Sequence, residues 1–208
     1  MIALFMEYCR SKQLRPKTMA SYEQTLKLFS RWLKEKYGTL ENLNACWWTS
    51  FWSQRYTDWS QVEAPGPMGE VSNTSMWVDW RRFSTWQCRT FIRNEREAVR
   101  AVDPSLKCTA NLMERFWDYD YFSLAEEIDV VSWDSYPQWH SGDDLATAAE
   151  FAMNHEIMRS LKDQPFLLME STPSQVNWRP VNKLKRPGMH LLSSMQAVAH
   201  GSQSVMYF

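Results

Sequence analysis

The most informative hydrophobic pattern in the chain is a continuous apolar run, Phe166-Leu167-Leu168-Met169. The run is too short for a helix and shows no polar alternation, which is typical of a strand buried on both faces in a parallel sheet. It ends at Glu170, and Pro173 cannot continue a central strand. Because α/β barrels place catalytic groups at the carboxyl ends of parallel strands, Glu170 is a candidate catalytic carboxylate. From the residues alone, a strand-end cap or an ion-pair partner explains it equally well.

Similar apolar runs and helical stripes alternate along the rest of the chain. The second helix is expected to begin at Thr18 as its N-cap, after Pro16 ends the first helix, and to close at Gly38. Strands that alternate with helices predict parallel pairing with right-handed crossovers, and therefore an α/β fold. The pattern predicts helices at 2–13, 18–38, 80–102, 121–128, 143–162 and 189–200, further strands at 107–113, 129–133 and 204–208, and a surface loop at 63–75.

The composition narrows the class of protein. At 208 residues with a formal charge of −1, the chain can bury a core and shows no broad electrostatic attraction to nucleic acid or to a membrane. The four cysteines form no Cys-x-x-Cys pair, which favours free thiols in a reducing compartment over a zinc site or a disulfide framework. No signal peptide and no long apolar span is found, so a cytoplasmic location without a membrane partner is expected.

The segment around Glu170 resembles a known family. Residues 169–180, Met-Glu-Ser-Thr-Pro-Ser-Gln-Val-Asn-Trp-Arg-Pro, are similar to the nucleophile segment of glycoside hydrolase family 42, the bacterial β-galactosidases. The resemblance extends over about residues 32–208, and implies a retaining hydrolase of β-galactosides that needs no cofactor or metal. It implies that Glu170 is the nucleophile and that Trp178 lines the sugar site. Two further matching segments, Phe-Trp-Ser-Gln-Arg-Tyr at 51–56 and Ser-Trp-Asp-Ser-Tyr-Pro at 132–137, imply sugar-pocket roles for Trp52 and Tyr136.

The same resemblance implies a partial (β/α)8 TIM barrel. The four expected strands correspond to strands five to eight of the family's barrel. Residues 1–33 instead resemble the N-terminal helices of phage-type tyrosine recombinases, through Tyr-Cys-Arg-Ser-Lys-Gln-Leu-Arg-Pro-Lys-Thr at 8–18 and the residues that follow. We therefore expect a helical, recombinase-like extension at 1–33 and a partial β-galactosidase barrel at 34–208.

The second carboxyl group of a retaining mechanism has no clear counterpart. In the family the acid/base follows an asparagine in an Asn-Glu-Tyr segment at the end of strand four, upstream of the helix at residue 32. Met6-Glu7-Tyr8 lies at nearly the matching distance but lacks the asparagine and a preceding strand, so Glu7 is a weak candidate. Asn94-Glu95 lies within the long helix and is weaker still. The resemblance therefore implies a truncated hydrolase of low or no activity.

Other polar residues have competing interpretations. For Asp134 a turn-forming role is favoured over a place near the sugar, and for Asn111 a pocket-facing position is left open. The histidines show no metal-ligand spacing, which favours helix-surface or capping roles; they are His140, His155, His190 and His200. The basic cluster of Lys183, Lys185 and Arg186 is expected in a solvated loop.

Two other functions compete with that of a hydrolase. The cations Arg10, Lys12, Arg15 and Lys17 could contact nucleic acid phosphates, although the recombinase-like segment is short and this partner is not favoured. Alternatively, a four-stranded half-barrel leaves open edges and apolar surface, which favours a non-catalytic homo-oligomer.

Overall fold

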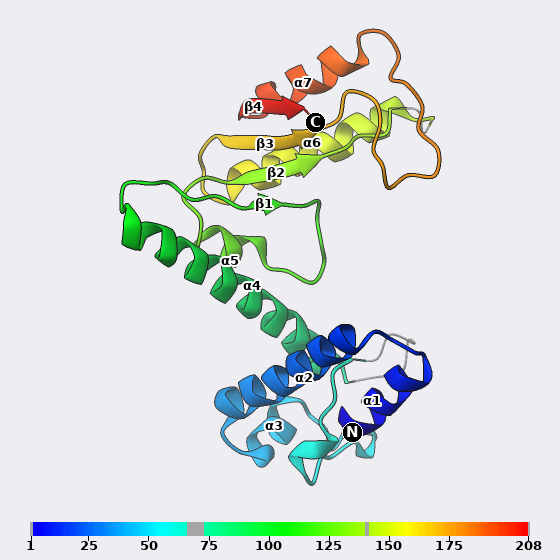
Figure 1. Cartoon of the computed structure of the whole chain (residues 1–208), viewed down its shortest axis with the longest axis vertical. Coiled ribbons are helices and arrows are strands. Elements are labelled where there is room, and N and C mark those ends of the chain that lie inside the picture. Colours follow the sequence, from blue (N-terminus) through cyan, green and yellow to red (C-terminus); the bar gives the residue numbers. More distant parts are fainter. Residues whose placement is uncertain (1, 66–72, 140–141, 208) are drawn as a thin grey trace. The chain divides into compact units, whose positions relative to one another are not determined.

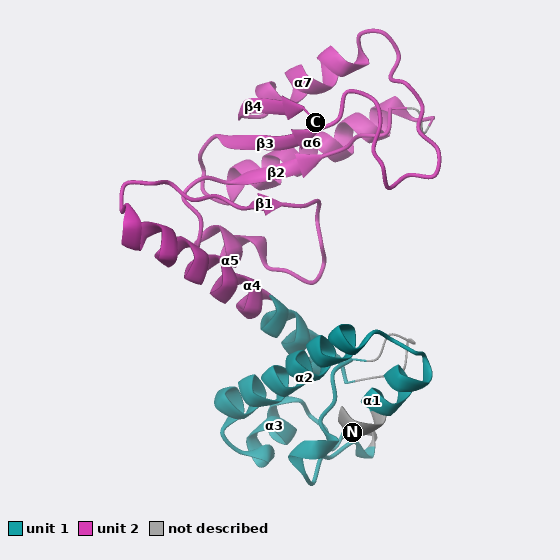
Figure 2. Ribbon diagram, viewed as in Figure 1, with its two compact units in different colours: residues 1–84 teal, residues 85–208 magenta. Residues whose placement is uncertain are grey.

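A computed structural model describes residues 2–65, 73–139 and 142–207 of the chain (Figure 1). The chain forms two compact units, residues 1–84 and residues 85–208 (Figure 2). In the described part of the chain, no helix is long and apolar enough to cross a membrane. The expected domain boundary between residues 33 and 34 falls within the continuous helix α2 (Pro16–Tyr37) and stays a prediction.

The first unit is helical. The first two helices begin close to the predicted positions, whereas the long helix predicted from residue 80 already begins at Thr74. The second helix starts at Pro16, in the first-turn position that proline favours, with Arg15 as the N-cap. Thr18 is therefore not the cap. Gly38 closes this helix as predicted, with a φ of 69°. The helices are α1 (Ile2–Ser11), α2 (Pro16–Tyr37), α3 (Leu40–Cys46), the short η1 (Phe51–Ser53) and η2 (Trp59–Gln61), and the start of α4 (Thr74–Val102).

The core of the first unit is aromatic. Phe29, Leu33 and Phe83 are almost fully buried, and Trp80 packs edge-on against Phe29 with ring centroids 5.0 Å apart. Aromatic rings at this distance and angle stabilise a core beyond the area that they bury. Part of the high tryptophan content is therefore structural.

The second unit is a parallel α/β sheet, as predicted. The strands β1 (Asn111–Leu112), β2 (Ser132–Ser135), β3 (Phe166–Ser171) and β4 (Ser202–Tyr207) pair in the order β1-β2-β3-β4, and all three pairings are parallel. Between the strands run α5 (Tyr121–Ala125), α6 (Asp144–Ser160) and α7 (Met189–Ala199), while the end of α4 precedes β1. The strands and helices alternate along the chain in the way that crossover connections require.

One face of this sheet packs against the helices. Trp133 and Leu168, which are register partners on β2 and β3, are buried in one cluster with Phe151 and Met158 of α6. Since neighbouring residues of a strand point to opposite faces, the residue after Trp133 belongs to the other face. The polar residues discussed below lie on that second face.

Candidate active site

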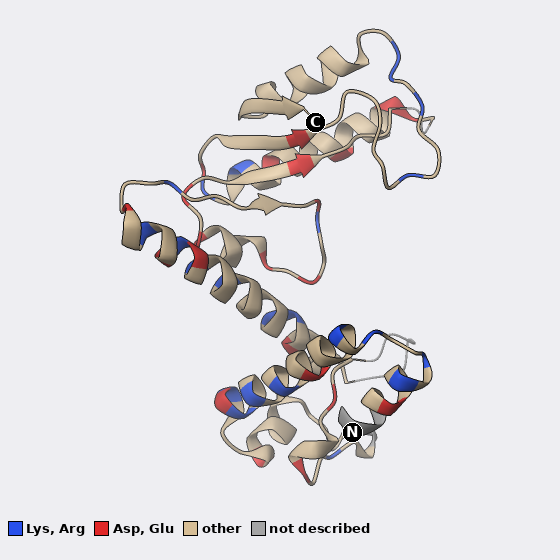
Figure 3. Cartoon of the chain, in the orientation of Figure 1, with Lys and Arg blue, Asp and Glu red and all other residues tan. Residues whose placement is uncertain are grey.

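Acidic residues lie at the carboxyl ends of the two central strands, β2 and β3 (Figure 3). Asp134 on β2 and Glu170 on β3 are register partners, so they lie side by side in the sheet. Glu170 thus lies at the end of an apolar strand, as expected, and its catalytic role stays a prediction. Asp134 lies within the strand, so the prediction that it forms a turn is wrong.

A β-bulge determines which way Glu170 points. Trp133 pairs with Leu168 and Asp134 pairs with Glu170, so β3 carries one extra residue, Met169, at this point. The pairing with β4 shows the same excess, because the four residues Leu168–Ser171 lie opposite the three residues Val205–Tyr207. Strict alternation would place Glu170 on the helix-covered face with Leu168. The bulge moves it to the face of Asp134, as bulges beside functional sites often do.

Tyr136 contacts the candidate nucleophile directly. It follows the last residue of β2 directly, two positions after Asp134. Its phenolic hydroxyl donates a hydrogen bond to Oε2 of Glu170. Burial, followed by this hydrogen bond, raises the pKa of the Tyr136 phenol above its ordinary value near 10, so the hydroxyl stays a donor at neutral pH. The structure therefore brings together Tyr136 and Glu170, two of the residues that the sequence singled out.

Trp178 joins this pair from the loop after β3. Its ring meets Tyr136 edge-on, with centroids 4.8 Å apart and an interplanar angle of 81°, and 55% of the residue is exposed. The next residue, Arg179, donates from Nη2 to the Tyr136 carbonyl oxygen at 2.9 Å. Burial, as the larger cause, lowers the pKa of Arg179. An exposed indole fixed beside a strand end is suited to stack on a sugar ring.

The loop that carries Trp178 is held by polar contacts that the sequence did not reveal. The Asn182 side chain accepts from the Val176 amide at 3.0 Å and donates to the Val176 carbonyl at 2.8 Å. Lys185 is half-buried and donates to the Thr172 carbonyl. The interpretation of the basic residues here as a solvated cluster is therefore wrong for Lys185.

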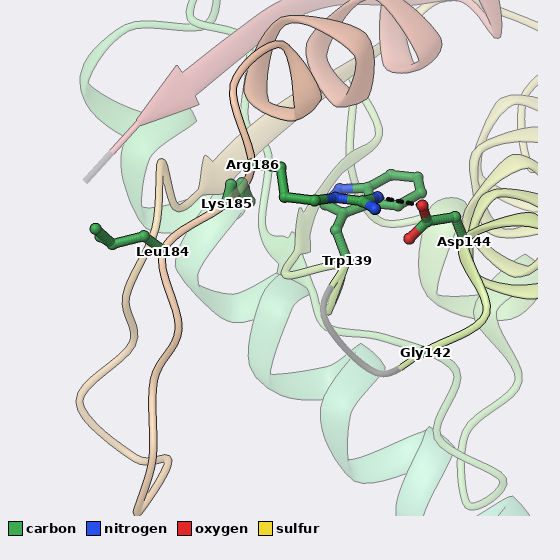
Figure 4. Close-up of a pocket in the computed structure, with 6 residues that line it drawn as sticks. All are labelled: Trp139, Gly142, Asp144, Leu184, Lys185 and Arg186. Atoms are coloured by element: carbon green, nitrogen blue, oxygen red, sulfur yellow. Dashed lines mark hydrogen bonds and ion pairs between the residues drawn. The ribbon is translucent and has the colours of Figure 1, made fainter.

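A small cavity lies beside the same loop. It has a volume of about 190 Å³, and its lining includes Trp139, Lys185 and Arg186. The Arg186 side chain reaches the Asp144 carboxylate at the start of α6 and forms an ion pair with it (Figure 4). Arg186 and Asp144 thus tie the loop to α6, while Lys185 bonds within the loop to Thr172.

Asp134 has an unusual environment for a carboxylate. Only 6% of the residue is exposed, and the Asn111 amide donates to its two oxygens at 3.1 and 3.4 Å. Burial raises the pKa of Asp134 to about 6, the charge of Glu170 adds to the rise, and the Asn111 hydrogen bond opposes it. Asn111, for which the sequence leaves a pocket-facing position open, thus lies beside Asp134. Asn111, Asp134 and Glu170 form a row of polar side chains across β1, β2 and β3.

The remaining sequence candidates divide among several places. Glu7, on α1, and Trp52, in η1, belong to the first unit, and the side chain of Trp52 lies outside the described part of the chain, so their proposed roles stay predictions. His140 lies outside the described residues. His155 is buried, with burial as the main cause that lowers its pKa to about 4, so a helix-surface role is wrong for it. His200 pairs with Glu156 at 2.7 Å.

Comparisons with known proteins agree with this geometry. The family model described as beta-galactosidase, glycoside hydrolase family 42, matches residues 14–208. The chain is 51% identical to the β-galactosidase BglY of Alicyclobacillus acidocaldarius over 181 residues, covering 86% of this chain and 26% of that protein. Against GanA of Bacillus subtilis the identity is 49% over 191 residues, covering 86% of this chain and 28% of the relative. The chain therefore spans just over a quarter of the length of these relatives.

Solved structures give the same result. The β-galactosidase of Rahnella sp. R3 matches with a TM-score of 0.82 and 54% identity, covering 88% of this chain and 27% of that one. The enzyme of Bacillus circulans sp. alkalophilus matches with a TM-score of 0.78 and 43% identity, covering 88% and 28%. Because the family match begins at residue 14, residues 14–33 belong to it, and the recombinase resemblance gains no support. The chain belongs to glycoside hydrolase family 42, the β-galactosidases, whose fold is the α/β TIM barrel.

Proposed function

We propose that the chain carries the nucleophile side of the active site of a retaining β-galactosidase, with Glu170 as the nucleophile and its four strands as strands five to eight of the barrel. The observation that supports this most strongly is the hydrogen bond from Tyr136 to Glu170 at the carboxyl end of β3. It combines with the bulge at Met169, which turns Glu170 away from the helix-packed core. The relatives of the chain are β-galactosidases, which supports a β-galactoside as the substrate.

The chemistry follows from this arrangement. Glu170 attacks the anomeric carbon, the new ester bond forms, and the bond to the leaving oxygen breaks. Tyr136 holds Oε2 of Glu170, which orients the other carboxylate oxygen for attack. Water then hydrolyses the ester with retention of configuration. The roles of Tyr136 and Glu170 in this scheme are those of positioner and nucleophile.

The sugar would be placed by the aromatic residues. Trp178 is exposed and fixed beside Tyr136, so its face can stack on the galactose ring while Glu170 meets the anomeric carbon. The sugar-pocket role that the family resemblance implies for Trp52 stays a prediction. Stacking of this kind orients the substrate, which is a large part of the rate advantage of an enzyme.

Among the described residues, none is assigned the role of proton donor. A retaining enzyme needs a second carboxyl group about 5–5.5 Å from the nucleophile, where it meets the leaving oxygen. Asp134 faces Glu170, but it is buried within the sheet and hydrogen-bonded to Asn111, so it is poorly placed to contact a leaving group. Glu7 stays a weak candidate. Because general acid catalysis contributes about 10²–10⁴-fold, we propose that the 208-residue chain turns over ordinary galactosides weakly or not at all.

A mechanism-based reagent tests the nucleophile without requiring the acid. The reagent is 2,4-dinitrophenyl 2-deoxy-2-fluoro-β-galactopyranoside, whose leaving group departs without protonation and whose fluorine slows hydrolysis of the ester. We expect mass spectrometry to find the fluorogalactosyl group on the peptide that contains Glu170. Glu170→Gln should give no adduct, whereas Glu126→Gln, a change at an exposed carboxylate paired with Arg89, should label normally.

Two results would contradict the proposal. An adduct on another residue, or one that persists in Glu170→Gln, would remove Glu170 from the role of nucleophile. Turnover of nitrophenyl galactoside within a factor of ten of a full-length relative, lost in Glu170→Gln, would contradict the weak activity. Self-association stays a prediction that sedimentation can test separately.

A further inference from the structure

Asp134 occupies a position that the mechanism above leaves unused. It is the register partner of Glu170, so the two carboxyl groups start from neighbouring backbone positions on adjacent strands about 4.8 Å apart. Both point to the face opposite the helix-packed core. The residue is buried, and the hydrogen-bond donor that the structure places on it is the neutral amide of Asn111.

Two adjacent carboxylates in such a place resist carrying two negative charges. Like charges that share a site raise the cost of ionising the second group, and a neutral amide offsets little of that cost. The groups that face Asp134 are Glu170 from β3, Asn111 from β1 and Tyr136, which directly follows β2. Glu114, after β1, and Arg179, from the loop after β3, both interact with Tyr136. The pair is therefore expected to hold one proton at weakly acidic pH.

The hydrogen bonds indicate which carboxyl group keeps the charge. Glu170 accepts from the phenol of Tyr136, and a hydrogen bond to the charged form of a carboxyl group stabilises that form. Asp134 has the weaker partner, an amide at 3.1 Å. The proton is accordingly assigned to Asp134, and its pKa of about 6, raised first by burial and then by Glu170, agrees with this.

We propose that Asp134 is a positioning residue for Glu170, holding the proton of the pair while Glu170 is the anion and releasing it when Glu170 becomes a neutral glycosyl ester. This inference rests on the proposed role of Glu170 as nucleophile. In the first step the Glu170 oxygen bonds to the anomeric carbon and the leaving group departs with the electron pair of the broken bond. Glu170 is then uncharged, so the like charge beside Asp134 is gone. The Asp134 proton passes to water and returns when the ester is hydrolysed.

The proton sharing can be measured without catalysis. In the full chain with ¹³C-labelled aspartate, we expect the Asp134 carboxyl to titrate near pH 6 in the wild type. In Glu170→Gln, which keeps the shape and removes the charge, its midpoint should fall by at least one pH unit. Glu126→Gln serves as the matched control and should leave it in place. Equal Asp134 midpoints in the wild type and in Glu170→Gln would overturn the inference.

Labelling connects the proton to the reaction. The chain labelled on Glu170 with the fluorogalactosyl group should show the same lowered Asp134 midpoint as Glu170→Gln, because the ester is also neutral. An unshifted midpoint in the labelled chain would overturn the release of the proton. If no adduct forms at all, the proposed function fails, while the comparison with Glu170→Gln still decides whether the two carboxyl groups share a proton.

A positioning role also predicts a pH profile. When Asp134 ionises, the second charge repels the Glu170 carboxylate from its place beside Tyr136, so the wild-type labelling rate should fall at least threefold between pH 5 and pH 8. Asp134→Asn cannot ionise, and its labelling rate should lose this decline. Parallel pH profiles for the two proteins would overturn the positioning role, and a merely structural change would lower the rate equally at both pH values.

Discussion

Asp79 and Asp134 are both buried aspartates, yet their surroundings differ in one decisive respect. Asp79, in the first unit, accepts from the ammonium of Lys36 and the hydroxyl of Tyr37, from the Trp47 indole at 3.0 Å and from Arg82 at 3.1 Å. Burial alone would raise its pKa, but these four hydrogen bonds together hold the pKa below its ordinary value of 3.8. Asp134 has one neutral donor and a like charge beside it, and its pKa rises to about 6.

The difference separates a structural carboxylate from the one that we propose to act beside Glu170. Two cations and two neutral donors satisfy Asp79, so its charge stabilises the fold. Asp134 is under-satisfied, and strongly perturbed carboxyl groups of that kind are concentrated at active sites. Glu127, in the second unit, resembles Asp79: it is buried and paired with Arg89, Arg93 and Arg96 of α4. Number and charge of donors, and not burial alone, therefore distinguish the two classes in this chain.

The largest expected effect on stability comes from replacing Asp79, the aspartate that accepts four hydrogen bonds. Asp79→Asn leaves the partly buried Lys36 without its partner, and breaking a buried ion pair costs about 3–5 kcal/mol. Hydrogen exchange of the α2 and α3 amides measures the loss within the first unit. Unchanged exchange rates would mean that Asp79 is no more structural than Asp134.

Glu127→Gln extends the comparison to the second unit. Charge-assisted hydrogen bonds to the arginines are lost, so we expect the free energy of unfolding to fall by about 2 kcal/mol at pH 7. The hydrogen bond from Arg93 is the main cause that lowers the pKa of Glu127 to about 2. Its folded pKa lies below the ordinary value of 4.5, so its stabilisation is present above pH 4.5 and is lost as pH falls toward 2. Denaturation at pH 7 and pH 3 should show the wild type and the variant converging.

Asp134→Asn should change the free energy of unfolding in the opposite direction, so that the variant is the more stable protein at neutral pH. Since the folded pKa of Asp134 lies above 3.8, its protonated form is favoured by folding, and this advantage disappears as pH rises from about 4 through 6. The variant should therefore equal the wild type near pH 4 and be more stable by about 1–2 kcal/mol at pH 7.5. Urea denaturation at the two pH values measures this. A variant that is less stable at both would place Asp134 in the class of Asp79.

The smallest expected effect on stability belongs to Trp178→Ala. Its ring is mostly exposed, so the free energy of unfolding should change by less than about 1 kcal/mol. Labelling of Glu170 by the fluorogalactoside should nevertheless slow by tenfold or more if the indole places the sugar. Trp117→Ala, a change at another exposed tryptophan, is the matched control. Equal labelling rates in the two variants would remove Trp178 from the sugar site.

Much of the secondary structure could be predicted from the sequence because its signals are local. The helices that end near residues 37, 102, 160 and 199 and the four strands follow from apolar periodicity, Gly38 and the prolines. The errors concern residues whose role depends on partners distant in sequence. The sequence favours a turn for Asp134, a helix surface or a cap for His155 and solvent for Lys185. In the structure Asp134 accepts from Asn111 on β1, and His155 packs against Trp133 and Phe166. Lys185 donates to the Thr172 carbonyl, thirteen residues away in the same loop. Local patterns carry no information about such neighbours.

The sequence by itself determined that Glu170 ends an apolar strand of a parallel sheet and that the family is that of the β-galactosidases. Only the tertiary structure decided which way Glu170 points. Alternation along β3 would turn it toward the helices, and the extra residue at Met169 becomes visible only when β3 is paired with β2 and β4. The bulge is a property of the register between strands, and register is set by the packing of the whole sheet. For the same reason, the pairing of Asp134 with Glu170 could not be read from either segment alone.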